Sequence, residues 1–310
     1  MKFSVGLQYQ RESFLDCIRQ YAPHIGEIYF AWGDFPNGRN SQIYSEEYTL
    51  WELQQRQMDA LQMVSDLGIP LNLLFNATCY GADSQSRAFF HKVGQTIDYI
   101  GSRFGLESVT TTSPLIAKFT KDNFPQLKTR ASVNMEIGTV QGMDYLGTYF
   151  DGYYMQRECN RNFETIRSLS TWCRQNGKTL HILANSGCLN HCSAHMFHDN
   201  LVAHEQQIAK MDNAYQFTGI CREYLRDPAH YKSLIEDTSF IRPEDVVKYE
   251  PYFQTMKLAT RVHRCPESVL QSYINRRYSG DILALLEPAH SVYPYVIENG
   301  EPLRLVKIGE

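Results

Sequence analysis

The sequence has no long apolar stretch. Nowhere does it approach the roughly 18 consecutive apolar residues of a membrane-spanning helix, and its start, "MKFSVGLQYQ", lacks the apolar core of a signal peptide. Excess positive charge is also absent, because the net charge is −4 at pH 7. A chain of this charge has no general attraction to nucleic acid or to an anionic membrane. We therefore expect a cytoplasmic protein with no membrane span and no DNA partner.

Four familiar patterns are missing as well. The segment closest to a glycine loop, "GDFPNGRN", matches no nucleotide-binding fingerprint, and no Ser–His–Asp order of a hydrolase is evident. The sequence contains neither an internal repeat of solenoid length nor a low-complexity linker. We therefore expect residues 1–310 to form a single domain.

Cysteine, by contrast, is plentiful. The eight cysteines are Cys17, Cys79, Cys159, Cys173, Cys188, Cys192, Cys221 and Cys265. In a reducing cytosol, so many thiols indicate metal binding or redox chemistry more than disulfides. Cys17 and Cys173 lie within amphipathic helical patterns, which predicts that both are plain buried residues.

Short apolar segments alternate with helical patterns along most of the chain. The predicted strands are 2–7, 27–32, 71–76, 108–112, 129–134, 152–156, 179–185 and 255–260. The predicted helices are about 11–23, 49–67, 86–102, 114–121, 140–148, 161–176 and 266–278. Eight strands separated by helices predict an α/β fold, a (β/α)8 barrel of the TIM type. A doubly wound open sheet is the alternative, because periodicity alone does not show closure.

One connection is too long for a simple barrel loop. About 70 residues, in the range 186–254, separate the seventh predicted strand from the eighth. Long loops in compact domains are usually functional or disordered. Because this one is rich in cysteine and histidine, we expect it to be a metal-carrying insertion within the barrel.

Polar side chains follow the ends of the predicted strands. They are Gln8, Asp34, Asn76, Cys79, Thr111, Asn134, Arg157, Glu158, Asn185, Cys188, Arg261 and Cys265. In a TIM barrel, residues after the carboxyl ends of the strands line the catalytic mouth. A set this polar predicts an active site that takes a small molecule, in which Asn134 and Asn185 are candidate substrate-binding residues.

The segment "SGCLNHCSAHMFHDN" (186–200) concentrates possible metal ligands. If it starts a helix, Cys188 and Cys192 lie one turn apart, and His191 and His195 share a face. Two thiolates with one or two imidazoles suit a tetrahedral zinc ion. A [4Fe–4S] cluster instead takes four thiolates, which can come from separate parts of a chain.

Further thiols are available for a cluster. Cys221 lies in the same long connection, and a fourth ligand could come from Cys79 or Cys265, which each follow a predicted strand. The alternative is that these thiols are simply buried.

Two arginines indicate the kind of substrate. Arg157 and Glu158 are neighbours at the end of the sixth predicted strand, where a guanidinium can grip a carboxylate while the glutamate orients it or handles protons. The alternative for this pair is a salt bridge that closes the upper layer of the barrel. Arg261 adds a second cation after the last strand. We interpret Arg157 and Glu158 as catalytic and Arg261 as substrate-binding, for a small anionic ligand.

These motifs occur in a familiar order. The segments are "VTTTSP", "FPQLKTRASVN", "YYMQRECNRNFETIRSL", "LHILANSGCLNHCSAHMFH" and "FIRPEDV". In this order they resemble the collagenase-like unclassified peptidase family numbered thirty-two of the U group (U32). The resemblance covers roughly residues 3–290, and it is most specific at Arg157–Glu158, at Asn185–Gly187–Cys188 and at "IRPED" (241–245).

The resemblance implies a barrel that carries an iron–sulfur cluster. It points less to proteolysis than to oxygen-independent hydroxylation or RNA-base modification, and the short family members assist anaerobic ubiquinone hydroxylation, apparently paired with a second family member. Carried over to this chain, the cluster ligands are Cys188, Cys192, Cys221 and Cys79. The early cysteine of the short members follows the second strand, whereas Cys79 follows the third, so Cys265 stays an alternative.

Three functions follow as hypotheses. The first is an iron–sulfur barrel enzyme, or a subunit of one, that modifies a small anionic or aromatic substrate. The second is a non-catalytic partner whose cluster is structural or passes electrons to another protein. The third is a zinc-dependent hydrolase or peptidase built on Cys188, Cys192 and His195.

Overall fold

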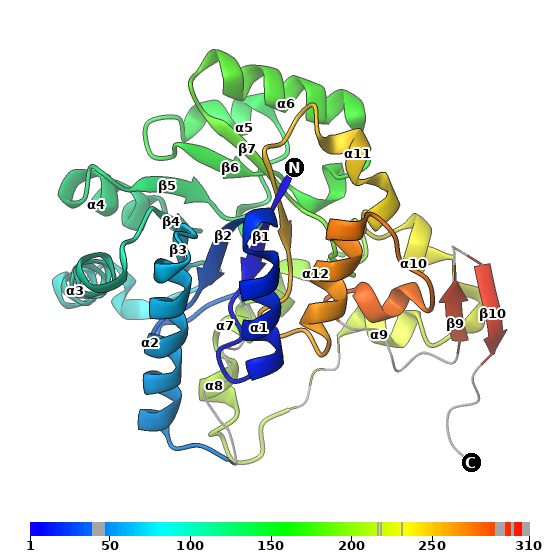
Figure 1. The fold of residues 1–310 in the computed structure, drawn as a ribbon, viewed down its shortest axis with the longest axis horizontal. Coiled ribbons are helices and arrows are strands. Elements are labelled where there is room, and N and C mark those ends of the chain that lie inside the picture. Colours follow the sequence, from blue (N-terminus) through cyan, green and yellow to red (C-terminus); the bar gives the residue numbers. More distant parts are fainter. Residues whose placement is uncertain are drawn as a thin grey trace.

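Eight parallel strands close into a barrel. Each strand pairs with the next one along the chain, and β8 returns to pair with β1 (Figure 1). The strands are β1 (Lys2–Gly6), β2 (Ile25–Phe30), β3 (Leu71–Phe75), β4 (Ser108–Thr111), β5 (Lys128–Ala131), β6 (Gly152–Tyr154), β7 (Thr179–Leu183) and β8 (Thr255–Leu258). The computed structural model describes residues 1–38, 47–215, 217, 219–230, 232–288, 295–298 and 301–305. Closure confirms the predicted TIM-type barrel and excludes the open sheet.

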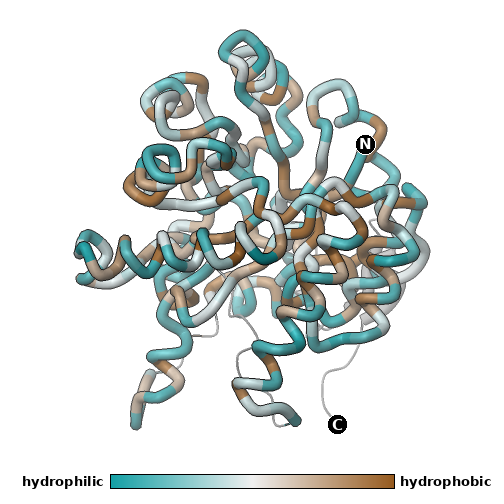
Figure 2. The backbone as a smooth tube through the Cα atoms, turned by 60° about the vertical axis from the view of Figure 1, so that its left-hand side comes forward, coloured by the Kyte–Doolittle hydropathy of each residue, from teal (hydrophilic) through white to brown (hydrophobic). Residues whose placement is uncertain are grey.

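Helices surround the strands at the positions that the sequence predicts. They are α1 (Glu12–Tyr21), α2 (Leu50–Asp66), α3 (Arg87–Phe104), α4 (Pro114–Asn123), α5 (Val140–Tyr145), α6 (Phe163–Gln175) and α12 (Pro266–Asn275). Hydrophilic and hydrophobic residues alternate along these outer helices (Figure 2), as a helix with one face on a core requires. Cys17 and Cys173 lie on such buried faces, which confirms their predicted role.

Side-chain caps fix where several of these helices begin. Thr49 and Glu52 form a reciprocal capping box at the start of α2. The side chains of Ser86, Ser113 and Asn162 each accept a hydrogen bond from a backbone N–H in the first turn of α3, α4 and α6. These caps satisfy backbone N–H groups that would otherwise lack a partner.

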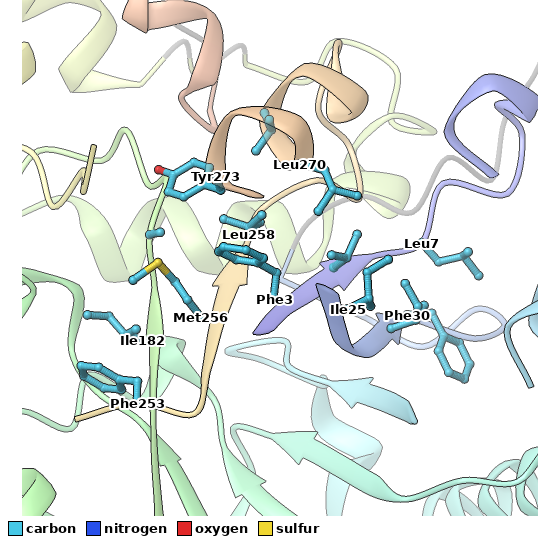
Figure 3. Close-up of a cluster of buried hydrophobic side chains, with 14 of the residues drawn as sticks. Phe3, Leu7, Ile25, Phe30, Ile182, Phe253, Met256, Leu258, Leu270 and Tyr273 are labelled. Atoms are coloured by element: carbon cyan, nitrogen blue, oxygen red, sulfur yellow. The ribbon is translucent and has the colours of Figure 1, made fainter. Parts of the chain in front are cut away.

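Apolar side chains fill the space between the strands and the helices. Figure 3 shows Phe3, Met256 and Leu258 of the strands against Leu270 and Tyr273 of α12. The rings of Phe3 and Tyr273 meet edge to face, with centroids 6.2 Å apart. This packing joins the first and last strands of the barrel to the helix that follows them.

The interior of the barrel is polar, in contrast to the branched apolar side chains that usually fill it. Every strand contributes one residue to a connected group that we call the polar layer. Its members are Ser4, Glu27, Asn72, Thr110, Arg130, Tyr154, His181 and Lys257, and all of them are buried. The group lies below the carboxyl ends of the strands, so it forms the floor on which any site at the mouth rests.

The carboxylate of Glu27 is the centre of the polar layer. It pairs with Arg130 and accepts hydrogen bonds from Ser4 Oγ (2.5 Å), Asn72 Nδ2 (3.2 Å) and the Tyr154 hydroxyl (3.1 Å). Burial by itself would raise the pKa of Glu27, but the Arg130 charge and the Ser4 hydrogen bond outweigh it and lower the pKa to about 2. Glu27 is therefore ionised at neutral pH.

The long connection between β7 and β8 is mostly short helices. It contains α7 (His195–Ala203), α8 (Glu205–Ile208), α9 (Ile220–Tyr224), α10 (Ser233–Glu236) and α11 (Val246–Tyr249). The predicted long insertion is thus present. A hairpin of β9 (Tyr295–Glu298) and β10 (Glu301–Leu305) near the end of the chain was not predicted from the sequence. Within the described ranges, no helix has the length and apolar character needed to cross a membrane.

Glu27→Gln should destabilise the barrel by about 3–5 kcal/mol, because it leaves the Arg130 guanidinium buried without its counter-charge. Urea unfolding at pH 7 measures the change. In the wild type, the contribution of Glu27 is complete above pH 4.5, the ordinary pKa, and is lost as the pH falls toward 2.

The matched control is Glu107→Gln. Glu107 pairs with Lys128 at 3.0 Å, but both side chains are largely exposed, and such surface pairs contribute about 0–1 kcal/mol. Equal losses of stability in the two variants would contradict the central role of Glu27.

Candidate functional site

A cavity of about 610 Å³, partly open to solvent, lies at the carboxyl ends of the strands. We call it the mouth cavity. Its lining comes from β2, β3, β7 and β8 and from segments that follow these strands, β5 and β6, and comprises Tyr29, Gly38, Leu74, Asn76, Val133, Asn134, Arg157, Leu183, Ser186, Asp199, Lys257, Ala259, Arg261, Val262 and Glu287. The position agrees with where barrel enzymes hold their substrates.

Basic side chains outnumber acidic ones in the lining of the mouth cavity. Arg157, Lys257 and Arg261 line it, against the two carboxyl groups of Asp199 and Glu287. The guanidinium of Arg261 is largely buried and donates to Asn37 Oδ1 at 3.0 Å, which holds it in place. A fixed, partly desolvated cation of this kind favours an anionic ligand.

Two asparagines form one wall of the mouth cavity. Asn134 Nδ2 donates to the backbone oxygen of Asn76 at 3.1 Å, and Asn76 Oδ1 accepts from the N–H of Gly38 at 3.1 Å. A Cβ atom at Gly38 would lie only 2.5 Å from Asn134 Nδ2, so this close approach requires glycine. Asn134 therefore lies where a substrate-binding residue is expected.

Asn185 lies elsewhere. It is fully buried, its Nδ2 donates to the backbone oxygens of Ala259 (3.2 Å) and Leu285 (3.0 Å), and its Oδ1 accepts from the Ala259 N–H (2.6 Å). These bonds tie the end of β7 to the end of β8. Asn185 is outside the described lining of the mouth cavity, so its position fits a structural role better than substrate contact.

Arg157 links the mouth cavity to the cysteine segment. Its guanidinium lies 3.6 Å from Asp199 Oδ2, contacts the imidazole of His195, and donates toward Cys188 Sγ at 3.8 Å. Arg157 and Glu158 therefore have separate partners, and a salt bridge between the two, the alternative considered for this pair, holds neither side chain. Arg157 is thus an anchored cation between the cavity and a thiol.

Glu158 faces a smaller cavity of about 250 Å³ next to the mouth cavity, and Cys188 also lines it. Its carboxylate accepts from the His191 N–H (2.5 Å) and from Gln156 Nε2 (2.8 Å). The residue therefore holds the turn that follows Cys188. This arrangement makes Glu158 a positioning residue for the cysteine segment.

Both ring nitrogens of His195 have partners. Nδ1 lies 2.6 Å from Glu136 Oε1, and Nε2 lies 3.3 Å from Asp199 Oδ2 beside Arg157. Burial and the Arg157 charge lower the pKa of His195. A zinc ion on His195 would have to displace one of these contacts. His191, by contrast, is exposed at the surface.

The segment does not start a helix at Cys188, because α7 begins only at His195, so the one-turn spacing of Cys188 and Cys192 that a helix would give does not apply. The preceding residues instead pair with another part of the insertion. Leu189 bridges to Thr238, and the Asn190 N–H donates to the backbone oxygen of Asp237 at 2.6 Å. His191 then adopts a left-handed conformation (φ 57°), which a helix does not allow.

The three thiols of the insertion nevertheless lie close enough for their charges to interact. Burial raises the pKa of Cys221, and the nearby thiols of Cys188 and Cys192 raise it further. Cys79 lies after β3, where its Sγ accepts from the Gly81 N–H at 3.5 Å, and Cys265 is exposed at the start of α12. Neither has a described contact with the other three. In the described ranges, no three or more His, Cys, Asp and Glu side chains form a ready site for one metal ion.

Comparison with known proteins gives one curated relative and one informative structure. No protein-family model matches the chain. The "uncharacterized protease MJ1657" of Methanocaldococcus jannaschii is 25% identical over 248 residues, which are 74% of this chain and 68% of that protein. The solved structure of the U32 peptidase Mk0906 superposes with a TM-score of 0.58 at 16% identity, over 83% of this chain and 92% of that one. The chain is thus similar in sequence to an uncharacterized protease and shares the fold of a U32 peptidase.

Another solved structure is more distant. A conserved Enterococcus faecalis protein of unknown function matches with a TM-score of 0.46 at 8% identity, over 89% of this chain and 65% of that one. A similarity this low supports no argument. The resemblance to U32 proteins that the motifs suggest thus rests on a sequence relative and a shared barrel, and neither names a substrate for this chain.

One residue of the mouth cavity was not predicted as part of a site. Lys257 belongs to β8 and lines the mouth cavity, although its neighbours in the strand are apolar. The signal was available in the sequence. A lysine between Met256 and Leu258 in a buried strand needs either a partner or a function, since a buried ammonium is costly.

Asn185→Ala should lower the free energy of unfolding by about 1–3 kcal/mol for each buried partner that it leaves unsatisfied. Asn134→Ala is the matched control and should cost about 1 kcal/mol or less, because that side chain makes a single weaker bond at the edge of the cavity. Urea unfolding of both variants gives the comparison. A larger loss for Asn134→Ala would contradict the structural role of Asn185.

Proposed function

We propose that this U32 relative is an iron–sulfur barrel enzyme, or a subunit of one, that modifies a small anionic or aromatic substrate without oxygen. The observation that carries the proposal is the grouping of Cys188, Cys192 and Cys221 beside a cation-rich mouth cavity. Arg157 touches both the Cys188 thiol and the cavity. A redox group at the thiols would therefore adjoin a ligand in the cavity.

The chemistry of the donors favours a cluster over a single ion. Two thiolates on one zinc ion lie about 3.8 Å apart, given Zn–S bonds of about 2.3 Å in a tetrahedron. The thiolates of a four-iron cluster lie farther apart than those on one zinc ion. That wider spacing suits the thiols of Cys188, Cys192 and Cys221, which interact but do not form a compact site for a single ion in the described part of the chain. Bound there, such a cluster supplies electron transfer or an open iron, since this segment offers three thiolates and not four.

The residues of the chain would divide the work. Arg261 and Asn134 would bind the anionic end of the substrate in the mouth cavity. Arg157 would keep a positive charge between that substrate and the Cys188 thiol. Glu158 would hold the turn at His191 and so position the thiols on either side of it.

Anaerobically purified protein should contain close to four iron and four sulfide per chain, with a brown absorption spectrum. Cys188→Ser, Cys192→Ser and Cys221→Ser should each lose most of this iron, because serine is a poor ligand for a cluster. Iron and sulfide analysis with the absorption spectrum is the measurement, and prolonged aeration should bleach the wild type.

Controls define the fourth ligand. If the fourth ligand is not a cysteine, both Cys79→Ser and Cys265→Ser should keep their iron. If only one of these variants loses iron, the cysteine replaced in it is the fourth ligand. Cys159→Ala is a control outside this group, since Cys159 packs beside Gly138. About one zinc per chain, or no metal after anaerobic handling, would refute the cluster.

Small carboxylates such as malonate and 4-hydroxybenzoate should raise the melting temperature of the wild type but not of Arg261→Gln. A ligand at ten times its Kd stabilises the folded state by about 1.4 kcal/mol. Thermal unfolding at increasing ligand concentration measures the effect. Arg19→Gln is the control, since Arg19 pairs with Asp16 on the exposed surface of α1. An equal rise in Arg261→Gln would contradict anion binding at the mouth.

The surface of the insertion favours the accessory hypothesis as a second candidate. Large apolar side chains are exposed there, namely Met196, Phe197, Met211, Tyr215, Phe217, Ile220 and Tyr224. Such a group near the thiols suits contact with another protein, such as a second family member that exchanges electrons. An accessory protein would bind that partner equally well after Arg261→Gln, whereas an enzyme would lose its substrate.

A further inference from the structure

Lys257 occupies an unusual position in the floor of the mouth cavity. Its side chain is 8% exposed, and Nζ lies over the rings of Tyr29 (4.0 Å) and Tyr154 (4.8 Å). An ammonium group has three donors and normally spends them on carboxylates or carbonyl oxygens. Within the described part of the chain, no such acceptor contacts Nζ. The tyrosine hydroxyls are already used, since Tyr29 donates to Leu258 and Tyr154 to Glu27.

The charges around Lys257 come from several strands. Arg261 lies in the turn after β8, Arg157 faces the same cavity, and Arg130 of β5 belongs to the same polar layer. Glu27 of β2 is the opposing charge, but it already pairs with Arg130. The surroundings of Nζ are therefore rich in cations.

These surroundings favour the free amine. Burial lowers the pKa of Lys257 most, Glu27 opposes this, and Arg261 and Arg130 lower it further, to about 7. The tyrosine rings favour the ammonium form, and the buried His181 is neutral, with a pKa lowered to about 3 by burial and Arg130. A desolvated lysine beside other cations is the usual form of an amine nucleophile.

We infer that Lys257 is a nucleophile that condenses with the carbonyl group of a small oxo-carboxylate, whose carboxylate lies against Arg261. Both residues line the mouth cavity, Lys257 from β8 and Arg261 from the turn that follows this strand. The inference rests on the proposed anionic substrate but is independent of the iron–sulfur cluster.

The reaction balances without an oxidant or a reductant. A bond forms between Nζ and the carbonyl carbon, the carbon–oxygen double bond breaks, and the two hydrogens of the amine leave with the oxygen as water. The product is an imine. Once protonated, it withdraws electrons from the adjacent carbon, which is the chemical advantage of lysine in such sites.

Reductive trapping tests the inference on the full chain purified anaerobically. Glyoxylate or pyruvate with sodium cyanoborohydride should give one reduced adduct per chain, which peptide mapping locates at Lys257. Lys248 is the internal control, because it is exposed and pairs with Asp245 at 2.6 Å. The rate of trapping should rise as the pH passes 7, where Lys257 loses its proton.

Variants separate the two parts of the inference. Lys257→Met should abolish the adduct, and Arg261→Gln should slow trapping by about tenfold or more, as expected from loss of a charge-assisted bond. Acetone, which has no carboxylate, should react poorly with the wild type. Because mapping of the wild type needs no variant, the test holds even if Lys257→Met does not fold.

Each contrary result has a definite meaning. Trapping at Lys248 but not at Lys257 would show that Lys257 is not the nucleophile. If Lys257 is trapped as fast with acetone as with glyoxylate or pyruvate, and equally fast in Arg261→Gln, the substrate is not an oxo-carboxylate held by Arg261. Iron content is measured on the same samples, so an adduct on iron-free protein would support the nucleophile while refuting the cluster.

Discussion

The ionised carboxylate of Glu27 is the constraint on which the rest of this barrel depends. A barrel interior is normally closed by interlocking branched apolar side chains, but here a buried charge gathers donors from the other strands. A buried carboxylate is tolerable only if it is fully satisfied, so the polar layer fixes the relative positions of the strands. The polar layer also places the Arg130 guanidinium below the mouth, where its charge helps to lower the pKa of Lys257.

The polar residues that follow the strands fall into two groups, which their positions in the sequence do not distinguish. Some hold parts of the fold together, as Asn185 does for the ends of β7 and β8 and Glu158 for the turn after Cys188. Others face the cavity, as Asn134 and Arg261 do. Arg157 belongs to both, since its guanidinium is anchored by an acidic residue while it borders the cavity. A substrate therefore meets a rigid, positively charged surface that is organised in advance.

The order and positions of all eight strands and of the helices between them could be predicted, because buried parallel strands and amphipathic helices leave strong local periodicities. The shape of the segment after Cys188 could not be predicted, because its backbone forms hydrogen bonds with residues near Thr238, some fifty positions away in the chain. The polar layer could have been found. "GEIYF" and "TMKL" each place a charged residue inside a buried strand, and only closure of the barrel shows that Glu27 and Lys257 belong to one polar layer.

All three grouped thiols belong to the connection between β7 and β8, and none belongs to the barrel wall. The wall closes through pairing of β1 with β8, which uses no residue of the insertion. The barrel can thus reach its final form before anything is attached to the thiols. With the proposed cluster, maturation of this protein would take place in two stages: a finished scaffold would receive the cluster at the rim, and a cell that lacks the loading machinery would accumulate a folded precursor without it.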